Sequence, residues 1–332
     1  MSRTQTITII CWCISAVVLL GLIVWVILGI IGSTAFGFRT INFELGGINF
    51  NNSRSYELIE THRIPASRIA ANEIEAISVD WISGSVSVSV HEGDEIIISE
   101  YSRRQVQDNH KMYIRTLGNQ MSIEFFDSTR TGINLNVPSK RLYVLIPYTL
   151  NENLHFFGIT TVSGNIQVSG ITSNNFLANT VSGRIELRDI SAPGLNAFTT
   201  SGRIRLANVN AEDISMRTVS GRIETSHTKA QRIRSYTTSG RHSLSGSFET
   251  VHSRSASGRI EITSSIVPDS VVATAASGRI YLTVPNDGTA PSVQYSTGSG
   301  RFRSDIPVLL HSGSDAQFQL TTASGRISIR RF

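Results

Sequence analysis

The sequence predicts an all-β protein: a β-solenoid with coils of about 19 residues, preceded by an irregular β region and one N-terminal transmembrane helix. Three observations lead to this prediction. The pair Ser-Gly recurs at nearly constant spacing through the C-terminal half of the chain. Apolar and polar residues alternate on both sides of each pair, and residues 7–32 contain no charged side chain.

The apolar segment near the N-terminus is long enough to cross a membrane. A helix over residues 7–32 would exceed the ~30 Å that the hydrocarbon core of a bilayer requires. A cleaved signal peptide with a small-residue site at Ser33-Thr34-Ala35 is the alternative, although signal peptides usually have shorter apolar regions. We therefore expect residues 1–36 to form a cytoplasmic tip and an uncleaved anchor of a single-pass cell-membrane protein. The C-terminal domain would then be extracytoplasmic.

The repeat is defined by its glycines. Two residues after each Gly there is usually Ile, as at Ile185, and seven residues before it a large apolar residue, as at Phe176. A period of two is that of β-strands, and a 19-residue unit is too short for two helical arms. Each coil should therefore bury one face against its neighbours. The glycines are Gly164, Gly183, Gly202, Gly221, Gly240, Gly258, Gly278, Gly300 and Gly325.

A column of hydroxyl residues lies three positions before the glycines. Thr occupies this position in most coils, Ser255 replaces it once, and Ala275 is the exception. The column is an even number of residues from the apolar position seven before the glycine, so its side chains point inside the coil. There, stacked Thr residues can form hydrogen bonds along the rod axis. The glycine supplies either a positive φ or a close approach of two backbones at the bend. His242, in the Ile column, is expected to be a core residue and not a ligand.

The segment between the anchor and the repeats lacks the 19-residue period. Residues 37–72 are predicted to be a stalk or linker, with a hairpin as the alternative. Residues 73–150 are predicted to form a β-rich region that caps the solenoid of residues 151–332. Within the capping region, two strands are expected around Ser83-Gly84, and others over residues 95–100, 112–116, 121–126 and 142–146.

A membrane anchor, an irregular β region and repeats such as Thr-Val-Ser-Gly-Arg-Ile of residues 180–185 resemble the bacterial putative-adhesin family of membrane-anchored β-strand-repeat proteins. The resemblance covers roughly residues 74–332. It implies a β-repeat architecture at the cell envelope and an adhesive or envelope-stress-associated role. Many members of that family carry Asp after the glycine, whereas this chain carries Arg eight times, so no ligand is carried over from the family.

These arginines are the candidate binding residues. Coils stacked in register would place them on one outward line with neighbours about 5 Å apart, and guanidinium groups bind phosphate and carboxylate well. The alternative is a structural role, in which the side chains cover coil edges and pair with Glu186, Glu224 and Glu261. The eight candidates are Arg184, Arg203, Arg222, Arg241, Arg259, Arg279, Arg301 and Arg326.

Charge and composition narrow the possible partners. Residues 1–150 carry 12 basic and 13 acidic side chains, and residues 151–332 carry 18 and 12, so the basic excess lies in the repeats. There are no Lys-rich runs of the kind that bind nucleic acid, and two Cys are too few for a disulfide scaffold or a thiolate zinc site. We expect no nucleic-acid partner, no cofactor and no metal site.

The sequence thus predicts a non-enzymatic, membrane-anchored protein of the cell envelope. Its expected ligand is an anionic polysaccharide, a teichoic-acid-like polymer or lipid head groups. A related hypothesis is that the protein is a scaffold associated with the envelope-stress response. The alternative is a carbohydrate-active enzyme, a lyase or hydrolase on a β-helix, which needs paired carboxylates that the repeats do not align. The chain ends directly after a predicted strand, at Arg330-Arg331-Phe332, so self-association through an uncapped C-terminal coil is also predicted.

Overall fold

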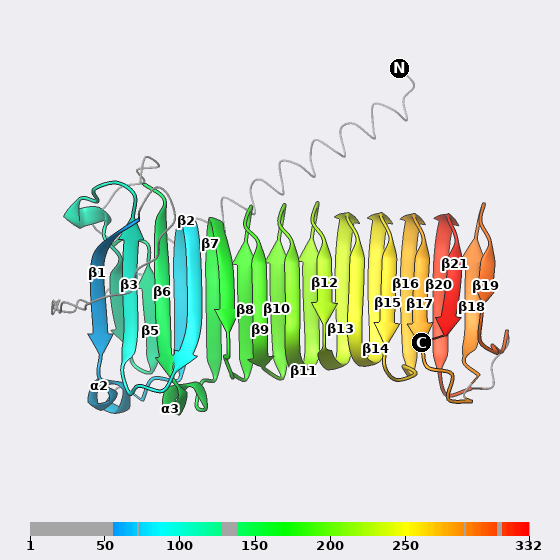
Figure 1. Cartoon of the computed structure of the whole chain (residues 1–332), viewed down its shortest axis with the longest axis horizontal. Coiled ribbons are helices and arrows are strands. Elements are labelled where there is room, and N and C mark those ends of the chain that lie inside the picture. Colours follow the sequence, from blue (N-terminus) through cyan, green and yellow to red (C-terminus); the bar gives the residue numbers. More distant parts are fainter. Residues whose placement is uncertain (1–55, 72, 128–137, 289, 311–313, 332) are drawn as a thin grey trace, which may run out of the picture.

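The computed structural model describes residues 56–331, apart from residues 72, 128–137, 289 and 311–313. These residues form a straight rod of stacked β-coils with a thicker N-terminal end (Figure 1). The all-β repeat architecture is confirmed. The predicted membrane-spanning segment, residues 7–32, lies outside the described residues, and no helix within them is long and apolar enough to cross a bilayer.

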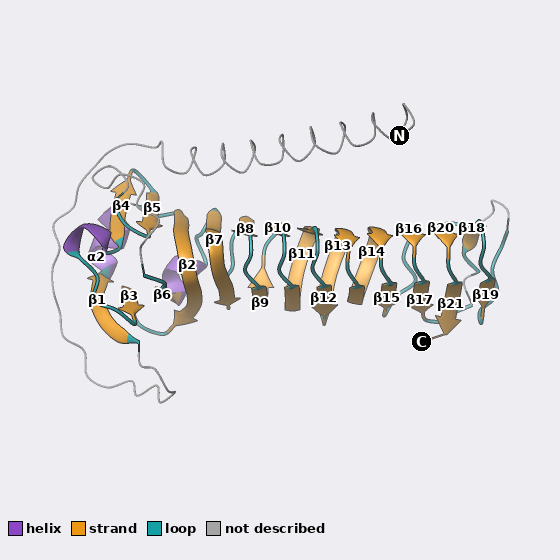
Figure 2. Ribbon diagram, turned by 90° about the horizontal axis from the view of Figure 1, so that it is seen from above, coloured by secondary structure: helices purple, strands orange, loops and turns teal. Residues whose placement is uncertain are grey.

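Each repeat coil contributes to two rows of parallel strands that face each other across the core (Figure 2). One row precedes the glycine turn and the other follows it, and long strands lead from one coil into the next. The strands are β7 (Phe156–Ser169), β8 (Asn175–Thr180), β9 (Ile185–Ser191), β10 (Gly194–Thr199), β11 (Ile204–Thr218), β12 (Ile223–Ser226), β13 (Thr228–Ser239), β14 (His242–Ser257), β15 (Ile260–Ser264), β16 (Ser270–Ser277), β17 (Ile280–Val284), β18 (Ser292–Thr297), β19 (Phe302–Ser304), β20 (Gln317–Ser324) and β21 (Ile327–Arg331).

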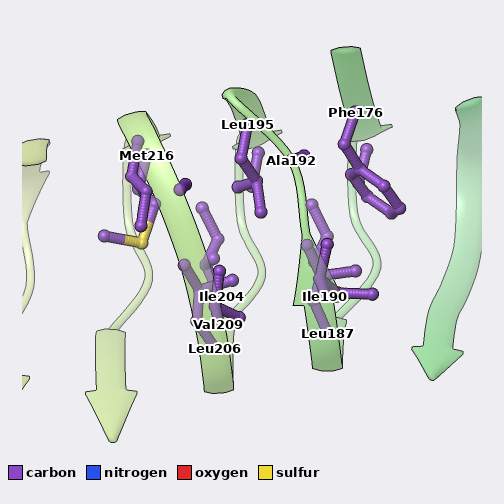
Figure 3. Packing of buried hydrophobic residues seen from close by; sticks show 14 of the residues in the cluster. Phe176, Leu187, Ile190, Ala192, Leu195, Ile204, Leu206, Val209 and Met216 are labelled. Carbon is purple, nitrogen blue, oxygen red and sulfur yellow. The ribbon is translucent and has the colours of Figure 1, made fainter. Parts of the chain in front are cut away.

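The predicted apolar columns form the core. Ile185, Ile204 and Ile223 are fully buried and lie in register on adjacent strands. Side chains from both rows point into the space between them, as Leu195 and Leu206 do in Figure 3. Each fully buried aliphatic side chain contributes about 1.5–3 kcal/mol, so the stack is stabilised mainly by contacts between neighbouring coils.

The glycine is required because successive turns touch. A Cβ atom on Gly202 would lie 1.7 Å from the carbonyl oxygen of Gly183. Thr199 accepts a hydrogen bond from the Gly202 N–H at 3.0 Å and donates one to the Gly183 carbonyl at 3.1 Å. Of the two predicted roles of glycine, close approach is therefore the one that applies at this turn. The Thr-x-Ser-Gly motif ties each coil to the one before it.

His242 is a buried member of the Ile column, as predicted. Its Nδ1 atom lies 2.8 Å from the Ser235 hydroxyl and 2.9 Å from the Ser253 hydroxyl, and all three side chains are fully buried. Burial lowers the pKa of His242 to about 4. The imidazole is therefore neutral at physiological pH and serves as a hydrogen-bonding core residue.

The solenoid begins earlier than the sequence predicted. The strand β2 (Ala76–His91) pairs in parallel with β7 and places Gly84 opposite Gly164. The strands β5 (Gln120–Glu124) and β6 (Lys140–Pro147) pair with the two halves of β2. Two further coils thus precede the recognised repeats, and the expected pair of strands around Ser83-Gly84 is one continuous strand.

The remaining elements cover these first coils. The strand β1 (Glu57–Ile64) pairs antiparallel with β3 (Ile96–Ser102), which pairs with β6, and β4 (Tyr113–Leu117) pairs antiparallel with β5. Short helices are α2 (Ala66–Ala71), α3 (Tyr148–Asn151) and the 3-10 turn η1 (Asp108–His110). Residues 57–71 therefore belong to the folded cap, which corrects this part of the predicted linker of residues 37–72. Residues 37–55 of that prediction lie outside the described residues.

A buried ion pair closes the first coil. Lys140 lies opposite Gly84 in the register, at the glycine position of its coil. Its ammonium group contacts the Glu100 carboxylate and the Phe125 carbonyl and donates to the His110 carbonyl at 2.8 Å. Burial lowers the pKa of Lys140 and raises the pKa of Glu100, while their mutual attraction opposes both shifts. The Trp81 indole N–H donates to the Lys140 carbonyl at 3.2 Å, in the place of the repeat threonine.

The coils at the other end do not stack in sequence order. The last coil of the chain, β20 and β21, lies between the coil of β16 and β17 and the coil of β18 and β19 (Figure 1). The prediction of an uncapped C-terminal coil is therefore wrong, because that coil has neighbours on both sides. The rod ends with β18 and β19 instead.

Candidate binding surface: an arginine line and a groove

The predicted arginines form a continuous line along the rod. The Ile185 N–H donates to the Arg203 carbonyl at 2.9 Å, and the Ile204 N–H donates to the Arg222 carbonyl at 2.9 Å. The same bond recurs from coil to coil and ends with Ile327 donating to the Arg301 carbonyl. The order in space is therefore Arg184, Arg203, Arg222, Arg241, Arg259, Arg279, Arg326 and Arg301.

The arginines nearest the cap are compensated by carboxylates. Glu224 lies 3.1 Å from Arg222, 3.6 Å from Arg205 and 4.0 Å from Arg203. Glu186 lies 3.7 Å from Arg184. Two of the three Glu residues that the sequence proposed as partners, Glu186 and Glu224, thus pair with this half of the line, where a structural role is sufficient.

The distal half of the line carries more uncompensated charge. Arg259 pairs with Glu261 at 3.0 Å. Arg241, Arg279, Arg301 and Arg326 are exposed, and none has an ion pair within the part of the chain that the structure describes. The last three of these lie in the last three coils of the rod, so their mutual repulsion favours the binding of an anion.

A shallow groove of about 570 Å³ runs beside the glycine turns over five adjacent coils. Its walls come from residues two to four positions before each glycine. The outward position four before the glycine is occupied by Arg217, Tyr236, Arg254, Thr274 and Thr321 in successive coils. The groove therefore follows the rod axis and not the strands.

Two guanidinium groups and an aromatic ring lie together in this groove. Arg217 lies 5.4 Å from the centroid of the Tyr236 ring, whose centroid is 5.7 Å from that of His252. Burial, followed by the charges of Arg254 and Arg234, lowers the pKa of His252. The surroundings of Tyr236 thus have a positive potential, and His252 is neutral at physiological pH.

Sequence reasoning missed the groove for an identifiable reason. The regular repeat pattern lies in the inward columns and in the residue after glycine, whereas Arg217, Tyr236 and Arg254 share an outward column before the turn. Comparing that column across coils would have found them. The described lining contains hydroxyl, methyl, aromatic and guanidinium groups but no carboxylate. Within the described residues, no cluster of three or more potential metal ligands is present.

Among the similar solved structures, a match with a TM-score above 0.5 shows the fold. A putative adhesin from Parabacteroides distasonis is 12% identical, with a TM-score of 0.52, and the match covers 82% of this chain and 97% of that one. A putative lipid binding protein from the same species is 14% identical, with a TM-score of 0.46 and coverage of 81% and 96%. A putative adhesin from Bacteroides fragilis is 12% identical, with a TM-score of 0.43 and coverage of 84% and 99%. No curated protein matches the chain.

The family comparison covers nearly all of the described rod. The family model described as Toastrack DUF4097 matches residues 74–330. This range begins just before β2, so it includes the two early coils that lack the regular spacing. The resemblance inferred from the repeats is confirmed: the chain belongs to the Toastrack family DUF4097, a family of domains of unknown function.

Proposed function

We propose that this protein is a non-enzymatic binding protein of the cell envelope. Residues 7–32 anchor it in the membrane, and the rod lies outside the cytoplasm, where the arginine line binds an anionic polysaccharide, a teichoic-acid-like polymer or lipid head groups. The observation that carries the proposal is the register of the line, which gathers Arg279, Arg326 and Arg301 in adjacent coils without carboxylate partners among the described residues.

The spacing of the line supports a polymeric or multivalent ligand. Adjacent coils lie about 4.8 Å apart, so successive guanidinium groups can each contact one anionic group of a chain or of a head-group array. Arginine suits this role because its planar fork donates two parallel hydrogen bonds to phosphate or carboxylate. A purely structural role would predict carboxylates beside the distal arginines as well, and the described residues offer only Glu261.

The test compares two triple variants that remove the same charge. Arg279→Gln/Arg301→Gln/Arg326→Gln removes the uncompensated end of the line, and Arg184→Gln/Arg203→Gln/Arg222→Gln removes the paired end. Retention of the full-length protein on immobilised teichoic acid, polygalacturonate and phosphatidylglycerol vesicles is measured over a salt series. We expect the first variant to weaken retention and flatten its salt dependence more than the second. The proposed function would be contradicted if the unmodified protein were not retained, or if its retention did not depend on salt.

The anchor is tested separately by topology. Protease added to intact protoplasts or spheroplasts should remove the bulk of the protein, because the rod is exposed at the cell surface in this proposal. Full protection of the rod would contradict an extracytoplasmic location. The result is independent of the binding assay, since it does not depend on which polymer the line recognises.

One observation supports the enzymatic alternative. Asp80 and Glu124 lie opposite each other on adjacent strands, and burial, with the charge of Glu124, raises the pKa of Asp80 to about 6. A carboxylic acid of raised pKa beside a second carboxylate is the arrangement that glycoside hydrolysis needs. However, Arg115 binds Glu124 at 2.6 Å, and neither acid lines the groove. Release of reducing ends from polysaccharide by the native protein, lost in Asp80→Asn, would favour this alternative.

A further inference from the structure

We propose that the groove is a separate binding site for an acidic polysaccharide. In this proposal one sugar ring packs on Tyr236, and acidic groups of the flanking sugars bind Arg217 and Arg254. The site goes beyond the proposed function, because the arginine line takes no part in it and a ligand of the line need not enter the groove.

The three residues are arranged in register. Arg217 pairs with Tyr236 between β11 and β13, and Tyr236 pairs with Arg254 between β13 and β14. Strands in a sheet lie about 4.8 Å apart, so the two arginine backbones are separated by about 10 Å with the ring between them. This geometry offers one aromatic surface flanked by two cations along the rod axis.

The charges at this site are not used by the protein itself. Arg232 and Arg234, on the same row of strands, each bind Asp213 at 2.5 Å. Arg217 and Arg254 have no carboxylate partner within the described part of the chain, and Arg217 contacts only the face of Tyr236 among the interactions found there. The two arginines next to the ring are therefore available for an anionic ligand.

The shape and chemistry of the groove favour a linear glycan. It continues over the coils of Thr274 and Thr321, whose hydroxyl groups can exchange hydrogen bonds with sugar hydroxyls. Aromatic side chains have an apolar face that suits the C–H face of a sugar.

The experiment measures binding of a hexameric oligogalacturonate to the full-length protein in detergent by calorimetry, with a neutral dextran oligomer for comparison. Arg217→Gln/Arg254→Gln should weaken binding at least about tenfold, because each arginine contributes a charge-assisted hydrogen bond. Tyr236→Ala should weaken it about threefold to tenfold without changing its salt dependence, because no charge is removed. Tyr236→Phe, which keeps the ring, should bind within about twofold of the original.

Two controls separate this site from others. Arg188→Gln/Lys229→Gln removes the same charge from exposed positions outside the groove and should leave affinity nearly unchanged. The triple variant Arg279→Gln/Arg301→Gln/Arg326→Gln should also bind the hexamer with unchanged affinity, even if it is no longer held on immobilised long polymers. The proposal is overturned if the hexamer does not bind, if the control pair weakens binding as much as the groove pair, or if only phosphatidylglycerol vesicles bind.

Discussion

The turn of the coil is built in two ways within one rod. In the repeats, a glycine touches the preceding coil and a threonine joins the two by neutral hydrogen bonds, as Gly202 and Thr199 do. In the first coil, Lys140 occupies the glycine position, its charge is paired with Glu100, and Trp81 of the next coil takes the place of the threonine. The same backbone path is therefore compatible with two kinds of turn. We call the glycine–threonine turn of the repeats the neutral corner and the turn of Lys140 and Glu100 the ionic corner.

The difference explains where the stack begins. From Gly183 onward, a Cβ atom on each repeat glycine would collide with the carbonyl of the glycine in the neighbouring coil on the cap side, whereas at Gly164 the nearest atoms belong to Thr161, at 3.2 Å. A side chain at this position is therefore excluded in these eight coils, and it fits at the first coil, which has no earlier coil among the described residues. Lys140 meets that condition, and its ammonium group binds the carbonyls of His110 and Phe125 and the carboxylate of Glu100. We infer that this cluster terminates the solenoid at its N-terminal end.

The largest expected effect comes from breaking the ionic corner. Lys140→Leu leaves the Glu100 carboxylate buried without its cation and should destabilise the protein by about 3–5 kcal/mol. Replacing both partners, as Lys140→Leu/Glu100→Leu, should recover much of this loss because no charge remains buried. Urea unfolding midpoints of the two variants test the comparison, and a double variant no more stable than the single one would contradict it.

The neutral corner is tested by adding one carbon atom. Gly202→Ala places a Cβ atom within 1.7 Å of a backbone oxygen, so adjacent coils must separate, at an expected cost of about 3 kcal/mol. Gly118→Ala is the matched control, because nothing lies within 4 Å of its Cβ and only its φ of +58° is unfavourable. That strain costs roughly 1–2 kcal/mol. Equal melting temperatures for the two variants would refute the packing argument.

The middle coils, around His242, and the first coils, around Asp80, should change in stability in opposite directions when the pH is lowered. The folded pKa of His242 is about 4, below its usual 6.5, so the unfolded chain takes up the proton first and the middle coils lose stability as pH falls through 6.5. The folded pKa of Asp80 is about 6, above its usual 3.8, so the first coils gain stability as pH falls through 6. At pH 5 the changes amount to a loss of about 2 kcal/mol and a gain of about 1 kcal/mol.

Hydrogen exchange resolved along the chain can separate these effects. Between pH 7.5 and pH 5, protection corrected for intrinsic rates should fall around β13 and β14 and rise around β2. His242→Ile introduces the residue that most coils carry at this position and should abolish the fall in the middle of the rod, while Asp80→Asn should abolish the rise. A parallel response of both regions would show that the rod titrates as one unit.

The repeats were predictable because their constraint is local. Each coil needs Gly, Thr and an apolar residue at fixed offsets, and a 19-residue interval makes these visible. The first coils escaped notice because residues 92–155 separate Gly84 from Gly164, and because Trp81 and Lys140 replace the usual residues. The exchanged order of the last coils could not be predicted, since the Gly300 and Gly325 coils carry the same motif and fit either place in the stack.

The smallest expected effect concerns the hydroxyl column, whose members are not equivalent. Thr199→Val keeps the shape of the side chain but removes the partner of the Gly202 N–H and of the Gly183 carbonyl, and should cost about 1–2 kcal/mol. Ser255→Ala should be nearly neutral. The Gly258 N–H already donates to the Ser277 carbonyl at 3.2 Å, and the buried Ser255 hydroxyl has no partner among the described residues. If the two variants unfold at the same denaturant concentration, the column stabilises the rod by filling space and not by hydrogen bonding.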